Sequence, residues 1–446
     1  MTISRPQPNP SQSEKSTEKI ESLSELYQAA VRLFSGEGAR AGYIAAIDQG
    51  LISLANFLAT LILARNVTPT QLGVYGVGFT ALRLVRAVQE GITIQPLNTF
   101  GAAMDEKAFK QYATSTSLIQ IVLALTGAAS VALAGWAATA MGNTTAGPAL
   151  FALWSNILWW QLQEYILRMM YTRGQVFNAT MNTLLANVVR IGLMIWWASQ
   201  ARLDGVTGLY AIALGSLVAL VPGLWQTRAY WSRHFTSLRQ TWMQNWGFGR
   251  WMLGSMIANW VSIEFYPILT AGMVSFAATG AYRALQNLVA PVQLLLRATD
   301  TFLTPRAARA YSLNGQPALA RLVRRSYLVT GIPILGFLSI IILFPEPILQ
   351  LLYGETYLEY SQGIYLMAAF YALMYAYWPL QTAFKAARIS RPIFIANLAA
   401  ILAMFTVGIW MIQRWGVYGT MAGQALNALI VLGVLWTAWQ GMRSER

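Results

Sequence analysis

Two faces of charged and amide side chains occur inside apolar stretches of this sequence. The longer face follows helical spacing over five positions: Arg283, Gln286, Gln293, Arg297 and Asp300. An arginine stays ionised at any physiological pH, and its planar guanidinium donates two parallel hydrogen bonds to a phosphate or a carboxylate. Because such a face is costly against lipid, the pattern predicts that it meets water, a protein partner or a bound anion.

The shorter face carries Arg83, Arg86 and Glu90 at steps of three and four residues. Arg86 and Glu90 are also spaced to form a salt bridge within one helix. Arg297 and Asp300 have the same option. Both pairs therefore have a purely structural explanation beside anion binding.

Three arginines, Arg83, Arg190 and Arg283, have no acid four residues away and need a partner from elsewhere. Acids inside other apolar stretches are one source: Asp48, Glu164 and Glu264. The same acids are candidates for binding a coupling proton or sodium ion, since a buried carboxylate is stabilised by either. The other source is a bound anion.

The sequence excludes several kinds of chemistry. It has no cysteine and one histidine, so disulfides, iron–sulfur clusters, thiolate zinc sites and cysteine nucleophiles are ruled out. No Gly-rich loop ends in the Lys-Ser or Lys-Thr that binds nucleotide phosphates, and no connection is long enough for a catalytic domain. We therefore expect no catalytic residue, no metal site and no cofactor.

The composition is that of a membrane protein. Hydrophobic residues make up 56% of the 446 positions and charged residues only 11%. The net charge of +14 is scattered in small groups between apolar runs, with no polar domain to collect it. This distribution favours anionic membrane lipid or an anionic substrate as the partner and argues against nucleic acid.

Twelve apolar stretches of about 20 residues are each long enough to cross a bilayer as a helix. Their approximate limits are 41–64, 72–97, 116–141, 149–170, 178–200, 206–228, 250–274, 276–300, 323–344, 362–384, 393–413 and 417–439. The predicted fold is an all-α polytopic membrane protein.

The two halves of the chain repeat one another. Two matches preserve the order of their motifs at an offset of roughly 200 residues: Ala-Asn56 and Gly73-Val-Tyr75 with Ala-Asn259 and Gly280-Ala-Tyr282, and Leu-Ala-Asn187 with Ile-Ala-Asn397. Six spans in each half predict two parallel bundles related by a pseudo-two-fold axis along the membrane normal. Because the second and eighth spans are equivalent, we expect their basic faces to oppose each other across a cleft.

The expected organisation has five parts. They are a cytoplasmic segment 1–40 with an interfacial helix beginning near Ser22, a bundle 41–228, a cytoplasmic linker 229–249, a bundle 250–439 and a tail 440–446.

The stretch Leu63-Ala-Arg-Asn-Val-Thr-Pro-Thr-Gln-Leu-Gly73-Val-Tyr75, followed by Gln95-Pro-Leu-Asn-Thr-Phe-Gly101-Ala, resembles the bacterial polysaccharide flippases. These Wzx-type O-antigen and exopolysaccharide exporters belong to the MATE-like superfamily. The resemblance implies transport of a polyprenyl-diphosphate-linked oligosaccharide across the inner membrane by alternating access, with anionic lipid and other polysaccharide-assembly proteins as further partners. Many such flippases have fourteen spans, and this chain has twelve.

The resemblance also implies what the arginines bind. A polyprenyl diphosphate would be the anion for Arg83, Arg86, Arg283 and Arg297, with Gln286 and Gln293 beside them. A cation-coupled drug or metabolite exporter of the same superfamily remains the alternative, and it would favour acids and aromatic rings in the cavity. An assembly scaffold without transport would need neither buried arginines nor a cleft.

Lys and Arg are distributed unevenly between the two sides of the predicted membrane. The termini and the even-numbered connections, counted together with the span ends that adjoin them, carry 23 of them, and the odd-numbered connections carry 3. Both termini are therefore predicted to be cytoplasmic. The densest inner groups, which we expect to hold the topology and contact anionic lipid, are Arg306, Arg309, Arg321, Arg324 and Arg325, then Lys385, Arg388 and Arg391.

This topology is testable with reporter fusions. Fusions after residues 145, 275 and 352 should report an outside location, and those after 240, 312 and 388 an inside location, because the cations favour the cytoplasm. One well-expressed reversal would refute the twelve-span map.

Overall fold

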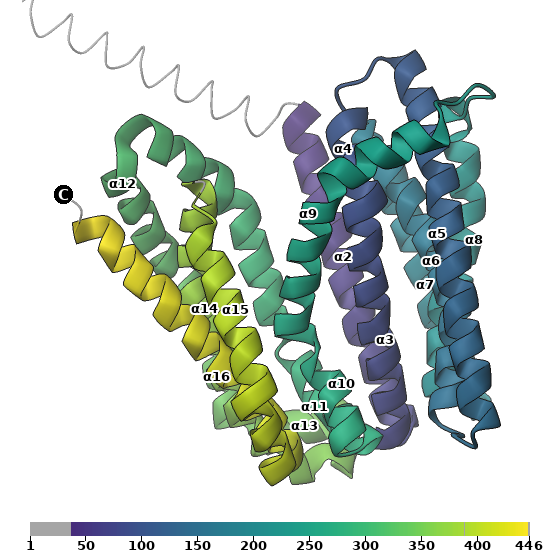
Figure 1. The fold of residues 1–446 in the computed structure, drawn as a ribbon. Coiled ribbons are helices and arrows are strands. Elements are labelled where there is room, and N and C mark those ends of the chain that lie inside the picture. Colours follow the sequence, from purple (N-terminus) through teal and green to yellow (C-terminus); the bar gives the residue numbers. More distant parts are fainter. Residues whose placement is uncertain (1–36, 388, 445–446) are drawn as a thin grey trace, which may run out of the picture.

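The computed structural model describes residues 37–387 and 389–444, and this part of the chain is helical with short connections and no β-strand. The interfacial helix predicted near Ser22 lies outside the described residues. Figure 1 shows two groups of long helices that converge at one end of the molecule and diverge at the other. The convergent end is the one at which α2 turns into α3, around residues 66–69.

The first group, which we call the N-lobe, contains α2 (Glu37–Asn66), α3 (Pro69–Gln89), α4 (Gln95–Gly101), α5 (Glu106–Ala140), α6 (Ala146–Thr172), α7 (Val176–Ser199) and α8 (Gly205–Gln226). The second group, the C-lobe, contains α9 (Leu238–Glu264), α10 (Tyr266–Met273), α11 (Phe276–Leu288), α12 (Ala290–Leu343), α13 (Pro345–Tyr353), α14 (Gly363–Ala386), α15 (Arg391–Ala403) and α16 (Ile409–Ser444).

Local sequence sets several helix starts. The Thr68 side chain caps α3 by accepting from the backbone of Gln71, and Pro69 follows at the first helical position. The side chains of Asp204 and Thr207 form a reciprocal capping box at the start of α8. Ser275 caps α11.

Each of the twelve predicted spans coincides with a helical segment, but several spans are broken. A π-helical turn, Glu90–Ile94, joins α3 to α4, and a second one, Met404–Gly408, joins α15 to α16. Gly315 and Gly416 adopt φ angles of 63° and 57° and separate two helices within α12 and within α16. A glycine adopts this left-handed conformation without the steric cost that a side chain would add.

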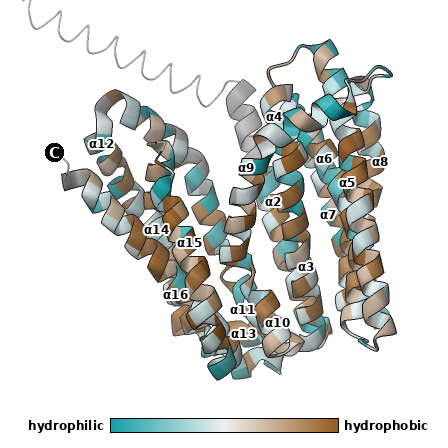
Figure 2. Ribbon diagram, in the orientation of Figure 1, coloured by the Kyte–Doolittle hydropathy of each residue, from teal (hydrophilic) through white to brown (hydrophobic). Residues whose placement is uncertain are grey.

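The long helices expose their apolar residues outward, as a membrane protein requires. Within residues 37–387 and 389–444, seven helical stretches are long and apolar enough to cross a membrane. In the most apolar window of α5, only 28% of the residues are buried within the protein. Figure 2 shows hydrophobic residues along most of α5, α15 and α16. The predicted fold class, a two-lobed helical membrane protein, is confirmed.

Helix α9 contacts both lobes. Near its start, Asn245 accepts a hydrogen bond from the Tyr112 hydroxyl of α5 at 2.7 Å. Phe248 meets Phe100 of α4 edge to face, with 5.3 Å between ring centroids. Toward its other end, α9 packs against α15 of the C-lobe. The residues from Leu238 onward, predicted as part of a linker, thus form the beginning of a helix that joins the lobes.

The lobes approach most closely where α3 crosses α11. A Cβ atom on Gly73 would overlap the carbonyl oxygen of Phe276, and one on Gly280 would overlap the carbonyl oxygen of Pro69. Phe276 and Pro69 each lie four residues before the opposite glycine, so the contact is reciprocal. The pseudo-two-fold relation predicted from the repeat therefore passes between these two glycines. Only glycine permits this backbone contact.

Enlarging Gly73 should force the lobes apart at this crossing. A Gly73→Leu change overpacks the contact by about 1–3 kcal/mol, which corresponds to roughly a 5- to 150-fold shift in an opening equilibrium. Since the chain has no cysteine, a Thr60→Cys reporter can be labelled selectively. We expect its reaction with a membrane-impermeant maleimide, added from the convergent end, to accelerate in the Gly73→Leu background.

Gly192→Leu in α7 is the matched control, because a Cβ atom there meets nothing within 4 Å. Its labelling rate should equal that of the parent. Equal labelling rates for the parent and the two variants would show that the α3–α11 crossing does not block access to the cavity from the convergent end.

Candidate functional site: a cationic cavity between the lobes

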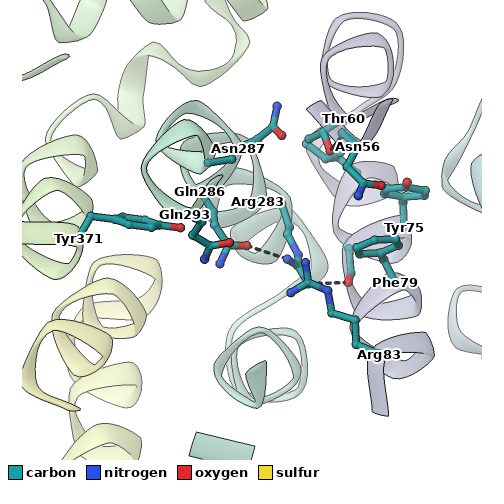
Figure 3. Close-up of a pocket in the computed structure, with 13 residues that line it drawn as sticks. Asn56, Thr60, Tyr75, Phe79, Arg83, Arg283, Gln286, Asn287, Gln293 and Tyr371 are labelled. Atoms are coloured by element: carbon teal, nitrogen blue, oxygen red, sulfur yellow. Dashed lines mark hydrogen bonds between the residues drawn. The ribbon is translucent and has the colours of Figure 1, made fainter. Parts of the chain in front are cut away.

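A cavity lies directly beside the α3–α11 crossing (Figure 3). Its volume, counted as space for the centres of water molecules, is about 90 Å³. It is lined by Asn56, Thr60, Leu72, Tyr75, Gly76, Phe79, Arg83, Arg283, Gln286, Asn287, Ala290, Gln293 and Tyr371. This lining has two arginines and no acid.

Arg283 extends from α11 of the C-lobe onto α3 of the N-lobe. Its guanidinium donates to the Gln286 side chain at 2.7 Å, to the Gly76 carbonyl at 3.1 Å and to the Thr80 hydroxyl. All three acceptors are neutral, and its Nε has no acceptor among the described residues. Gly76 makes room for the side chain, since a Cβ atom there would lie 2.6 Å from Arg283 Cγ.

Arg83 enters the same cavity from the opposite side and does have an acid partner. Its Nη1 forms an ion pair with Glu264 at the end of α9. The guanidinium also lies over the ring of Phe79, 5.2 Å from the ring centroid. The interhelical pairing that the sequence left open is therefore present for Arg83 and joins the two lobes.

The charges around this cavity do not balance. Glu264 interacts electrostatically with three cations, Arg83, Arg283 and Arg297. Arg83 and Arg283 line the cavity, and among the described residues Glu264 is the one carboxylate that pairs with either of them, which leaves an excess of positive charge in a largely apolar interior. An anion would be stabilised at such a place. Arg83 and Arg283, one from each of the basic faces predicted for the second and eighth spans, thus lie at the same cavity, whereas Arg86 and Arg297 are absent from its lining.

A separate ion-pair group lies within the N-lobe. Arg86 pairs with Glu164 of α6 at 2.8 Å, and Arg168 pairs with the same oxygen at 2.7 Å. Glu90 accepts instead from the Gln95 amide at 2.8 Å. The salt bridge that spacing allows between Arg86 and Glu90 is replaced by an interhelical one, because Glu164 is buried beside two arginines.

Two further acids bind hydroxyl groups. Asp48 accepts from the Tyr171 hydroxyl at 2.5 Å, and its second oxygen has no donor among the described residues. Asp300 accepts from Thr304 and Thr382 and lies 3.6 Å from the Lys385 ammonium. Of the three coupling candidates, Glu164 and Glu264 are thus neutralised by arginines, whereas Asp48 has no ion pair within the described ranges.

The family model described as "Polysaccharide biosynthesis protein" matches residues 62–362. The chain belongs to this family. The match covers most of the cavity lining, the α3–α11 crossing and both of the arginines that line the cavity; Asn56, Thr60 and Tyr371 lie outside it. The match assigns the chain to polysaccharide biosynthesis. A search of curated proteins found no match.

Solved structures with the same fold are transporters. One is an inward-facing multidrug resistance MATE family transporter of the MOP superfamily, with a TM-score of 0.71, 15% identity and coverage of 89% of this chain and 98% of that one. An outward-facing structure described in the same words has a TM-score of 0.64 and 15% identity, and the match covers 93% of this chain and 97% of that one. A MOP superfamily transporter from Pyrococcus furiosus, described as having a binding pocket of reverse polarity, has a TM-score of 0.59 and 14% identity, and the match covers 93% of this chain and 98% of that one. These likenesses establish the fold.

Five polar residues of the cavity of this polysaccharide biosynthesis protein were not among the site residues predicted from the sequence: Asn56, Thr60, Tyr75, Asn287 and Tyr371. Asn56 and Tyr75 lie in the repeated motifs, where they correspond to Asn259 and Tyr282 of the other half. The repeat was therefore a signal that these positions matter to the structure. Tyr371 reaches in from α14 (Figure 3), a helix that no motif connected with α3. Its place in the cavity depends on packing alone.

The Arg83–Glu264 pair can be tested by a double-mutant cycle. Arg83→Ala alone leaves the Glu264 carboxylate without its partner and should lower the stability of the purified protein. Adding Glu264→Gln should recover part of the loss, with a coupling energy of about 0.5–3 kcal/mol, because the two side chains touch. The measurement is denaturation in detergent, and additive effects would contradict the pairing.

Proposed function

We propose that this protein is a flippase that moves a polyprenyl-diphosphate-linked oligosaccharide across the bacterial inner membrane for polysaccharide biosynthesis. The observation that carries the proposal is the cavity between the lobes, which is lined by Arg83 and Arg283 and by no acid. A diphosphate is the part of such a substrate that these guanidinium groups would recognise. The glycan would lie in the widening space between the lobes, with the prenyl tail in lipid.

Arg283 has the central role in this proposal. Its bonds go to an amide, a carbonyl and a hydroxyl, so the charge itself has no direct counter-ion among the described residues. A neutral acceptor stabilises a buried guanidinium less than an anion does. A phosphate oxygen would supply that charge. Gln286 and Gln293 flank it as hydrogen-bonding groups for phosphate or sugar.

The alternative is a cation-coupled exporter of small, often cationic, compounds. Such a substrate would favour an acid facing the cavity. Glu264, the nearest acid, is held in an ion pair with Arg83 and is absent from the lining. The charge of the cavity therefore favours an anionic substrate. Coupling to a proton or a sodium ion is assigned to Asp48, whose carboxylate has no ion pair in the described part of the chain.

The lobes provide the means of alternating access. They are joined at the α3–α11 crossing and diverge toward the other end (Figure 1). The greater backbone similarity to the inward-facing neighbour, 0.71 against 0.64, supports an inward-facing state. With cytoplasmic termini, the crossing would lie at the outer face and the cavity would open to the cytoplasm, where lipid-linked precursors are made.

Replacement of Arg283 tests the proposal. Arg283→Ala should reduce glycan export at least tenfold, since the lost charged contact is worth about 1.5–3 kcal/mol. Arg283→Lys retains the charge without the planar fork and should restore export only partly. Export is scored by surface polysaccharide and by accumulation of the lipid-linked precursor on the cytoplasmic leaflet.

Arg228→Ala is the control, because Arg228 lies outside the cavity and stacks on Trp225. It should export normally. Normal export by an abundant Arg283→Ala protein would refute the anion-binding role of the cavity.

A further inference from the structure

A third arginine, Arg190, is buried behind the cavity wall. Arg190 belongs to α7 of the N-lobe, and only 6% of its surface is exposed. Its Nη1 donates to Oδ1 of Asn56 at 2.9 Å, and its Nη2 donates to the Tyr75 hydroxyl at 2.5 Å. Arg190 takes part in none of the ion pairs found among the described residues.

Arg190 does not line the cavity, but both of its acceptors do. A guanidinium has five N–H donors and no acceptor, so the amide atom of Asn56 that faces it must be the oxygen. The amide nitrogen of Asn56, with two hydrogens, is consequently turned away from Arg190. Figure 3 shows Asn56 and Tyr75 on the wall across from Arg283 and Gln286.

The same argument applies to Tyr75. Its oxygen accepts from Arg190, which leaves the single hydroxyl hydrogen to donate elsewhere. Its ring is held by stacking on Phe79, with 6.0 Å between centroids and planes 14° apart. Arg190 therefore sets two neighbouring polar groups of the cavity wall as hydrogen-bond donors.

Helix packing alone does not explain the arginine. The repeat aligns Asn187 with Asn397, and Arg190 then corresponds to Ala400. Ala400 is 1% exposed and packs in the hydrophobic core of the C-lobe. The repeated architecture thus builds the equivalent helix contact with a small apolar residue, and burying a cation at this position of the N-lobe costs free energy that packing does not require.

We propose that Arg190 is a positioning residue that orients Asn56 and Tyr75 to donate hydrogen bonds to the phosphate oxygens of an anionic lipid headgroup bound near Arg83 and Arg283. The inference rests on the proposed function. The Arg283 guanidinium of the C-lobe would then bind the headgroup from one side. From the other side, Asn56 and Tyr75 of the N-lobe would donate neutral hydrogen bonds, and Arg190 behind them would fix their orientation.

The experiment measures binding of farnesyl diphosphate, with farnesol as the uncharged comparison, to the purified full-length protein in detergent. The wild-type protein should prefer the diphosphate. Arg190→Met should weaken diphosphate binding about tenfold, the equivalent of about 1.4 kcal/mol, and leave farnesol binding unchanged. The pair of changes Asn56→Leu and Tyr75→Phe should have a similar effect, because it removes the oriented donors directly.

The decisive comparison is the triple variant. If Arg190 acts through Asn56 and Tyr75, adding Arg190→Met to the double variant should weaken binding no further. Additive losses, near a hundredfold in total, would overturn the inference. They would mean that the arginine acts independently of the two donors.

Arg190→Lys separates orientation from charge. One ammonium lacks the fork that reaches two acceptors at once, so diphosphate binding should remain impaired. Full affinity in this variant would overturn the inference in favour of a through-space effect of the charge. The lysine variant also serves if Arg190→Met fails to fold, with thermal unfolding recorded for each protein.

The outcomes also separate the inference from the proposed function. Diphosphate preference in the wild type with unchanged affinity in the Arg190 variants overturns the inference alone. Equal binding of farnesyl diphosphate and farnesol by the wild type overturns both, because a wall of oriented donors would then have no anion to bind.

Discussion

The cost of placing charge in an apolar interior governs this structure. Every cation among the helices must be offset, and the described residues do this in three ways. Arg86 and Arg168 share the Glu164 carboxylate, Arg83 pairs with Glu264 across the lobes, and Arg190 and Arg283 have only neutral partners. Neutral acceptors offset a buried charge incompletely. The residual positive charge is concentrated where the lobes meet, which is also where a transported anion would have to pass.

Pseudo-symmetry explains how that concentration arises. The backbones of α3 and α11 cross through Gly73 and Gly280 with reciprocal contacts, so equivalent positions of the two helices face each other. The side chains do not follow this symmetry. Arg283 corresponds to Gly76, and its side chain occupies the space that the glycine leaves. A symmetric backbone with unlike side chains thus places a cation from one lobe on the other.

The contacts of Arg83 and Arg283 between the lobes also affect how the lobes can move relative to each other. The Arg83–Glu264 pair and the bonds of Arg283 to α3 all cross between the lobes and lie beside the cavity. A bound anion would compete for the same guanidinium groups and weaken these links. Binding of substrate would in this way be coupled to separation of the lobes, since a ligand shifts an equilibrium only by its different affinity for the two states.

Much of the architecture followed from the sequence alone. Twelve apolar stretches and a repeat with preserved glycine and asparagine positions determined a helical, two-lobed membrane protein, because lipid permits few other ways to satisfy the backbone. The repeat also placed Arg83 and Arg283 opposite each other. Partner choice was decided only by tertiary structure. Helical spacing allowed Arg86 to pair with Glu90, whereas packing gave Arg86 to Glu164 of another helix and gave Glu264 to Arg83. Spacing along the sequence shows which side chains can meet within one helix. The partner that best neutralises a buried charge depends on which other helices pack beside it, and only the tertiary structure decides that.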